Sequence, residues 1–380
     1  MAVSVAGGVR PGKLIEVERR LYQHLIVGKH KAAAMEDDIN ETLEADANKL
    51  DIERQAIQVR LDKQTKALAV FKAISNQLTE TVNNSIEHKL ASPDLLLTHS
   101  GVQEGQILLL DLLLDKDPNF GRIRPIISSI SWLSRDLITL INSPASKHRR
   151  PKTSDVQVTD IKLILNYIGL ENLRLLIPYF CSRHWLPSGH ANLLWTTRKL
   201  WRYSMITAIA AQALAQLHNR PTHVSYTCAL LYQLGTSVIL SSSVKVFEKH
   251  WGNWLREASH SRDKEVYDAV MATEFPAEQI FNHVMEHGHH LNWQLLEQLE
   301  FSDSAITKVL KELDQDYHFS ELSIDAAIVA KASCFAKIIL LEEHQLLEPQ
   351  ERKVLLDYYE FTPQEVIRLK AQNYRKLDLA

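Results

Sequence analysis

The fold is decided by residues 195–240, which read WTTRKLWRYSMITAIAAQALAQLHNRPTHVSYTCALLYQLGTSVIL. Spacings of three and four residues, the period of one helix face, separate Leu200, Tyr203, Thr207, Ala210, Leu214 and Leu217. Ile206, Ile209 and Ala213 widen the apolar stripe, which predicts a helix buried on more than one side. Because proline cannot continue a helix, residues 219–221 (Asn-Arg-Pro) should end it.

A second helix is predicted from about Ser225 to Leu231, and Gly235 then interrupts or bends the pattern. The two helices carry the segments LWRYS (200–204) and ALLYQLG (229–235). This pairing resembles the HDOD family, a relative of the HD phosphohydrolases, in which a helix like L-W-R-H-S is followed by one like G-L-L-H-D-I-G. The resemblance implies an HD-type helical scaffold. It also implies a bacterial protein of signal transduction that often works through protein–protein contacts.

Three residues depart from the catalytic form of this pattern. Catalytic HD relatives bind metal through the histidine of the first helix and the His-Asp pair of the second. Those positions are Tyr203, Tyr232 and Gln233 here. Divalent metals prefer imidazole and carboxylate ligands, whereas tyrosine ionises only near pH 10 and glutamine is a weak, neutral ligand. Without a metal, nothing lowers the pKa of a bound water. The resemblance therefore implies a degenerate metal site, a pseudoenzyme and no cofactor.

Two further segments resemble the family, in the family's order. DPNFGRIRPIISSISWLSRDLITLINSP (117–144) has an Asp117-Pro118 opening and a helix-ending Asn142-Ser143. VTDIKLILNYIGLENLRLLIPYF (158–180) resembles the next helix pair, with Gly169 in the turn. The resemblance covers roughly residues 105–300, which we take as an HDOD-like helical domain.

The composition favours an all-α protein with a sizeable core. Of the 380 residues 45% are apolar, and 12 glycines and 12 prolines are fewer than average. We predict an HD-domain-like multi-helix bundle with an N-terminal long-helix extension and additional C-terminal helices. The net charge of -3 argues against a nucleic-acid partner. The three cysteines are expected to be reduced and buried. No secretory signal or uninterrupted 18-residue apolar run is present, which predicts a soluble cytoplasmic protein without membrane contact.

The N-terminal quarter should form a disordered start (1–12) and then a helical, coiled-coil-like region (13–92). Residues 13–90 contain no proline, and Leu43, Leu50, Ile57 and Phe71 lie on one heptad line that Gln64 interrupts. A single helix over 36–89 would be about 80 Å long. A helical hairpin, a coiled-coil arm for a homodimer or another protein partner, and simple packing on the rest of the chain remain alternatives.

Two polar clusters are candidate binding sites. Lys147, Arg149, Arg150 and Lys152 form a basic loop that suits a phosphate-bearing ligand or nucleic acid, or is a solvated connection. His283, His287, His289 and His290 are candidate metal ligands. His283 and His287 lie four residues apart on one helix face, near the position of a family histidine. The alternative is a polar helix face, because no H-E-x-x-H pattern is present.

Residues 301–380 should form further helices packed on or capping the HDOD-like domain. In one of these helices Ile324, Ile328, Phe335, Ile338 and Ile339 are predicted to point inward. Thr362 and Glu365 form a predicted capping box, with Pro363 at the first helical position.

Three functions follow from these observations. The first is a non-catalytic HDOD-type signalling or scaffolding protein whose former metal cleft persists as a ligand pocket lined by Tyr203, Tyr232 and Gln233. The second is a divergent metal-dependent phosphohydrolase that uses other ligands, such as His283 and His287. The third is a nucleotide- or nucleic-acid-binding regulator that uses the basic loop at 147–152.

Overall fold

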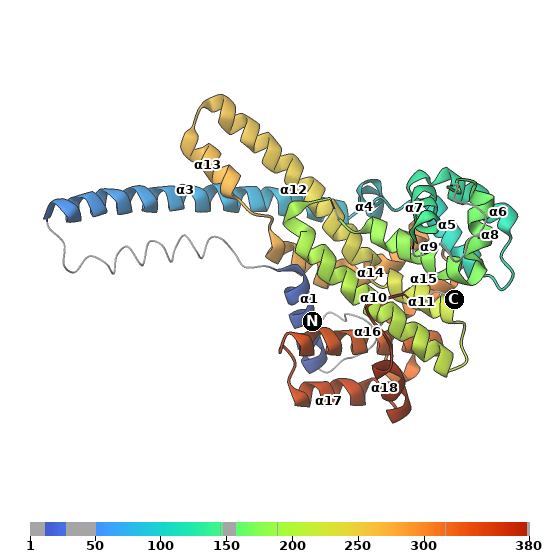
Figure 1. Cartoon of the computed structure of the whole chain (residues 1–380). Coiled ribbons are helices and arrows are strands. Elements are labelled where there is room, and N and C mark those ends of the chain that lie inside the picture. Colours follow the sequence, from blue (N-terminus) through green and yellow to red (C-terminus); the bar gives the residue numbers. More distant parts are fainter. Residues whose placement is uncertain are drawn as a thin grey trace.

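The computed structural model describes residues 12–27, 51–144, 146, 157–187, 189–315 and 317–377, and every regular element in these ranges is a helix (Figure 1). The all-α prediction is therefore confirmed for the described residues. The basic loop at 147–152 and residues 1–11 of the predicted disordered start (1–12) lie outside them, whereas Gly12 is the first residue of a helix. Leu43 and Leu50 of the heptad line also lie outside the described residues.

The centre of the molecule is built around one long buried helix. Helix α10 packs on α11 and α16, and α12 packs on α14. Most of α10 is buried, as the widened apolar stripe predicts. It ends where expected, because Asn219 takes a left-handed conformation (φ 53°). The bounds are Leu194–Leu217 for α10, Thr222–Leu231 for α11, Leu234–Ser261 for α12, Ala277–Gln298 for α14 and Ile324–Glu343 for α16.

The break between α11 and α12 falls at Tyr232 and Gln233, and Gly235 lies just inside α12. A Cβ at Gly235 would come within 2.1 Å of the Gly288 carbonyl oxygen, so glycine is required where α12 crosses α14. Asn292 of α14 holds the break in place. Its Oδ1 accepts a hydrogen bond from the Gly235 N–H (2.7 Å), and its Nδ2 donates to the Tyr232 carbonyl (2.8 Å).

Five shorter helices form the part of the bundle that precedes α10 in the chain. Asn142 closes α7 against the next segment: Nδ2 donates to the Val158 carbonyl and Oδ1 accepts from the Val158 N–H. Gly169 separates α8 from α9 with φ 77°, the left-handed region that a glycine turn permits. Both predicted helix ends are confirmed. The bounds are Glu104–Leu114 for α5, Phe120–Ser129 for α6, Ser131–Asn142 for α7, Ile161–Ile168 for α8 and Leu170–Trp185 for α9.

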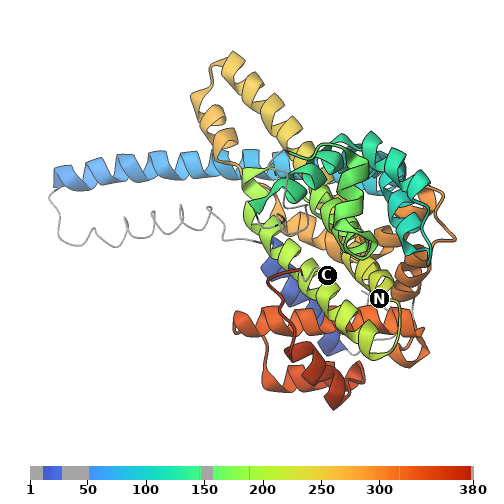
Figure 2. The same cartoon turned by 45° about the vertical axis from the view of Figure 1, so that its right-hand side comes forward.

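The N-terminal helices occupy two different places. Helix α1 (Gly12–Ile26) lies in the bundle, in contact with α10, α14, α16 and α17 (Figure 2). Helix α3 (Asp51–Leu90) has 40 residues and is about 60 Å long. Its first part extends beyond the bundle beside α13 (Lys264–Ala272) and the outer end of α12 (Figure 1). Its last part is buried, with Leu78, Val82 and Ile86 in the core. A short helix, α4 (Pro93–Ser100), follows it.

The C-terminal helices pack on the central bundle. They are α15 (Ala305–Asp314), α16, α17 (Pro349–Tyr358) and α18 (Pro363–Lys370). Ile328, Phe335 and Ile338 of α16 are buried as predicted. The prediction for Ile324 is wrong: it is 59% exposed, because it is the first residue of the helix, directly after the Ser323 N-cap.

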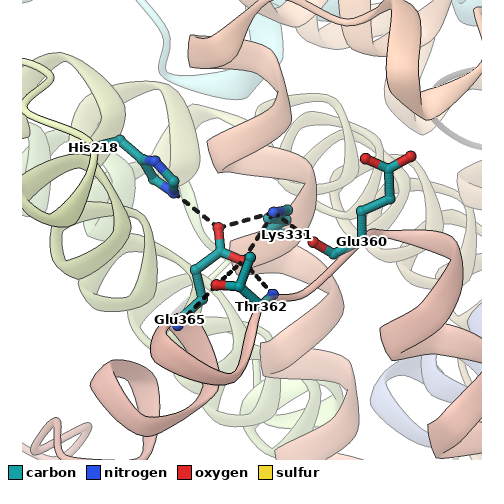
Figure 3. Close-up of polar contacts among 5 residues, drawn as sticks. All are labelled: His218, Lys331, Glu360, Thr362 and Glu365. Atoms are coloured by element: carbon teal, nitrogen blue, oxygen red, sulfur yellow. Dashed lines mark hydrogen bonds and ion pairs between the residues drawn. The ribbon is translucent and has the colours of Figure 1, made fainter.

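A buried carboxylate joins three of these elements (Figure 3). The predicted capping box is confirmed, since Glu365 accepts hydrogen bonds from the N–H and hydroxyl of Thr362. Glu365 also accepts from Lys331 Nζ of α16 (2.8 and 3.0 Å) and lies 2.8 Å from His218 Nε2 at the end of α10. Burial alone would raise the pKa of Glu365, but these hydrogen bonds together lower it.

The stretch Thr222–Ser261 contains a window long and apolar enough to cross a membrane by length and composition. The whole window is buried inside the protein, as in the core helix of a soluble protein. The three cysteines are also buried, as predicted.

Candidate functional site

The residues in place of the HD-type metal ligands lie together in the core. Tyr203 comes from α10, and Tyr232 and Gln233 form the break between α11 and α12. Each is at most 3% exposed. Helix periodicity places Tyr203 on the inward stripe of α10, and the tight crossing at Gly235 turns the break inward. The three positions surround one side chain that the motifs do not include, Tyr22 of α1.

Tyr22 fills the space between these positions. Its hydroxyl donates to Gln233 Oε1 (3.1 Å) and accepts from Gln233 Nε2 (2.9 Å). Its ring packs edge-on against the rings of Tyr203 and His289, with 6.4 Å between ring centroids in both pairs. His289 in turn lies against Tyr232, at 4.8 Å between ring centroids. The Tyr22 side chain of α1 thus lies between Tyr203 and Gln233.

Helix α16 closes the other side. The Tyr203 hydroxyl lies 2.8 Å from Ser333 Oγ. Lys337 Nζ donates to Glu18 Oε1 of α1 at 2.7 Å, and both side chains are almost fully buried. His289 Nε2 lies 3.7 Å from the same Glu18 oxygen. We refer below to the polar cluster, which comprises Glu18, Tyr22, Tyr203, Tyr232, Gln233, His289, Ser333 and Lys337.

The electrostatics of the polar cluster favour a neutral Tyr203. Burial raises the pKa of Tyr203 well above 10, and the charge on nearby Glu18 raises it further. The phenol therefore stays protonated at neutral pH and serves as a hydrogen-bonding group. Within the polar cluster, the carboxylate of Glu18 is paired with the ammonium of Lys337. A buried charge is tolerated when it has an opposite charge as its partner.

The four candidate histidines do not converge. His289 points into the polar cluster, whereas His283 Nε2 lies 2.8 Å from Asn83 Oδ1 of α3, with His287 stacked beside it. His290 faces α15, with Nδ1 2.8 Å from Asp314 Oδ2. Among the described residues, no group of three histidine, cysteine or acidic side chains could hold a metal ion. The residue of α14 that lies beside Tyr232 is His289, two positions after His287.

Sequence reasoning found Tyr203, Tyr232 and Gln233 but missed the partners from α1 and α16. One signal was present in each helix. Glu18 shares the helix face of Leu14, Leu21 and Tyr22, a charge placed in an apolar stripe. Lys337 stands in the apolar run CFAKIILL. A charge on a buried face indicates a buried partner. Nothing in either pattern indicates which partner, because 319 residues separate the two.

Comparison with known proteins gives one match. The family model described as HDOD domain matches residues 105–276. The searches of curated proteins and of solved structures found no match. The matched region contains α10, α11 and α12 with Tyr203, Tyr232 and Gln233, and it ends just before α14. Residues 105–276 of this chain are thus similar to the HDOD domain.

Proposed function

We propose that this protein is a non-catalytic, cytoplasmic HDOD-type signalling or scaffolding protein that acts through contacts with other proteins. One observation carries the proposal: the space between Tyr203, Tyr232 and Gln233 is filled by Tyr22 of the chain's own helix α1. The resemblance assigns the metal ligands of catalytic relatives to those three positions. A substrate phosphate and a metal-bound water would need the volume that Tyr22 takes.

The elements that fill the cleft come from outside the matched domain. Helix α1 precedes residue 105, and α14 and α16 follow residue 276. They contribute Glu18, Tyr22, His289 and Lys337. This supports a scaffold whose former active site has become part of the structural core.

Helix α3 is the proposed surface for protein partners, including a second copy of the chain. Its first part extends beyond the bundle (Figure 1) and carries Val59, which is 69% exposed. A groove of about 550 Å³ runs between α3 and α13, with Leu68 and Phe71 on one side and Ala269 on the other. An apolar groove along an extended helix suits another helix packed lengthwise.

The test of the catalytic claim combines metal content with turnover. Untagged protein purified without chelator should contain far less than one transition-metal ion per chain by elemental analysis. With excess Mn²⁺ it should not hydrolyse a phosphodiester or a cyclic dinucleotide faster than a heat-denatured sample of the same protein does. One or two tightly bound ions per chain, together with turnover, would overturn the proposal. His283 and His287 would then be the first ligands to mutate.

The partner surface is tested by mass in solution. Light scattering should give about twice the 43.4 kDa of one chain. Leu68→Glu should lower this mass towards a monomer because it places a charge in the groove between α3 and α13. Ile367→Glu in α18 is the matched control, since Ile367 is 71% exposed, and should leave the mass unchanged. A wild-type protein that stays monomeric at every concentration would remove the second copy as the partner.

A further inference from the structure

A second polar site lies far along α12 from the polar cluster. A pocket of about 810 Å³ is enclosed by the last turns of α3, by α4 and by the middle of α12. The three helices contact one another, and Figure 1 shows α4 near the end of α3 and beside α12. The volume is in the range of small-molecule sites, which are commonly 300–1,000 Å³.

The charges that line this pocket are all of one sign. Lys89 comes from α3, and Lys245 and Lys249 come from α12 one turn apart. His88 and His250 add two imidazoles, and no aspartate or glutamate lines the pocket. Among the described residues, Lys89 and Lys249 have no carboxylate within ion-pair distance. Burial, and then the charges of Lys249 and Lys245, lower the pKa of Lys89, so the three ammonium groups repel one another.

Helix geometry explains only part of this cluster. His88 and Lys89 lie in the last turn of α3, where positive charge suits the helix dipole. Lys245 and Lys249 lie in the middle of α12, where no such effect acts. Together with Lys89 they concentrate positive charge on one pocket, which favours the approach of an anion.

The remaining lining suits an organic phosphate. Ser85 donates its hydroxyl to the Thr81 carbonyl and lies 3.1 Å from His250 Nε2, so His250 is held in position at the pocket wall. Leu95 and Val246 provide an apolar surface beside the lysines. Lysine ammonium groups bind phosphate as point charges, and an apolar wall can contact the rest of such a ligand.

We infer that the α3–α4–α12 pocket binds the phosphoryl group of a small phosphorylated molecule between Lys89, Lys245 and Lys249. The pocket shares no residue with the polar cluster, so this site does not depend on the proposed function. It is a ligand site in a part of the molecule where catalytic relatives are not expected to carry out chemistry.

The test is calorimetric titration with AMP, inorganic phosphate and adenosine. AMP or inorganic phosphate should bind at low salt, more weakly as salt rises, and adenosine should not bind. If AMP binds at least about tenfold more tightly than inorganic phosphate, the ligand of the pocket is an organic phosphate. If the two bind with equal affinity, the pocket recognises inorganic phosphate. The double variant Lys89→Gln/Lys249→Gln should weaken binding by about tenfold or more, because it removes two charge-assisted contacts.

The matched control removes the same charge elsewhere. Lys353→Gln/Lys370→Gln changes two exposed lysines of α17 and α18 and should leave the affinity unchanged. Thermal unfolding of both double variants checks that each is folded. Failure of AMP and phosphate to bind at low salt would overturn the inference. Equal loss of affinity in the two double variants would also overturn it, because binding would then reflect net charge alone.

Discussion

The buried pair Glu18–Lys337 links α1 to α16 directly. Its members are joined at 2.7 Å and excluded from water. Buried ion pairs often stabilise little compared with apolar replacements, but breaking one by removing a single partner is costly. Replacing one partner and replacing both partners with apolar side chains therefore distinguish the contribution of the ion pair from that of side-chain packing at the same positions.

Lys337→Met should destabilise the protein by about 3–5 kcal/mol, because the Glu18 carboxylate stays buried without its lysine. The double variant Glu18→Leu/Lys337→Met should recover most of that loss. Urea unfolding of the two single variants and the double variant forms the cycle that measures the coupling. A loss below about 1 kcal/mol in Lys337→Met would contradict this prediction. It would mean that other neighbours of Glu18, such as His289 at 3.7 Å, are sufficient to stabilise the buried carboxylate.

Among the elements, the crossing of α12 and α14 sets the position of the break between α11 and α12. Gly235 permits the close approach, and Asn292 fixes Tyr232 and the start of α12. If the crossing opens, Tyr232 and Gln233 lose their positions in the polar cluster. A second glycine in α12, Gly252, has no heavy atom within 4 Å of its would-be Cβ and provides a comparison within the same helix.

Gly235→Ala should destabilise the protein by about 3 kcal/mol, since the new methyl group meets the Gly288 carbonyl and Leu291. Gly252→Ala should instead stabilise it by about 0.5–1 kcal/mol. Alanine lowers the conformational entropy of the unfolded chain, and its methyl group meets no neighbouring atom in the folded protein. Both changes are measured by thermal and denaturant unfolding. Equal effects at the two positions would contradict the close approach at Gly235.

The sequence predicted the elements better than their partners. Periodicity located α10 and its end at Asn219, and the motifs placed Tyr203, Tyr232 and Gln233 in one site. Local patterns could not show that Tyr22 fills that site, because its neighbours are brought together only by tertiary packing. The predicted inward position of Ile324 failed for a similar reason: a period gives the face of a residue, whereas exposure at a helix end depends on what lies beyond it.

At the scale of the whole molecule, α1 holds the C-terminal helices on the bundle through ionisable groups. Arg20 binds Glu351 of α17 with two hydrogen bonds (2.8 and 3.1 Å). The Lys199 ammonium donates to the His24 carbonyl, and the His24 ring lies 4.2 Å from that of His344 at the end of α16. The docking of α1 should therefore respond to pH.

Two pH windows are expected, which overlap only between about pH 4 and 4.5. Burial first, and then the charges of Lys199 and His344, lower the pKa of His24 to about 4 from 6.5. The unfolded chain thus binds this proton first, and stability falls as the pH drops from about 6.5 to 4. The hydrogen bonds from Arg20 lower the pKa of Glu351 to about 2 from 4.5. Its contribution is lost as the pH drops from about 4.5 to 2.

Melting temperatures measured from pH 2.5 to 7.5 check this prediction. His24→Gln should reduce the slope only in the upper window, where other buried histidines such as His283 also contribute. Glu351→Gln should lower stability at neutral pH and reduce the slope only in the lower window. A wild-type slope that neither variant changes would show that these groups do not govern the docking of α1.

The docking of α1 also has a consequence for the synthesis of the chain. Glu18 leaves the ribosome first, yet its lysine is encoded 319 residues later. At about 5–20 residues per second, the two are separated by roughly 16 to 60 s of translation. During that interval the apolar face and the carboxylate of α1 lack their native surroundings. The ion pair of Glu18 and Lys337 can therefore form only after α16 has been translated.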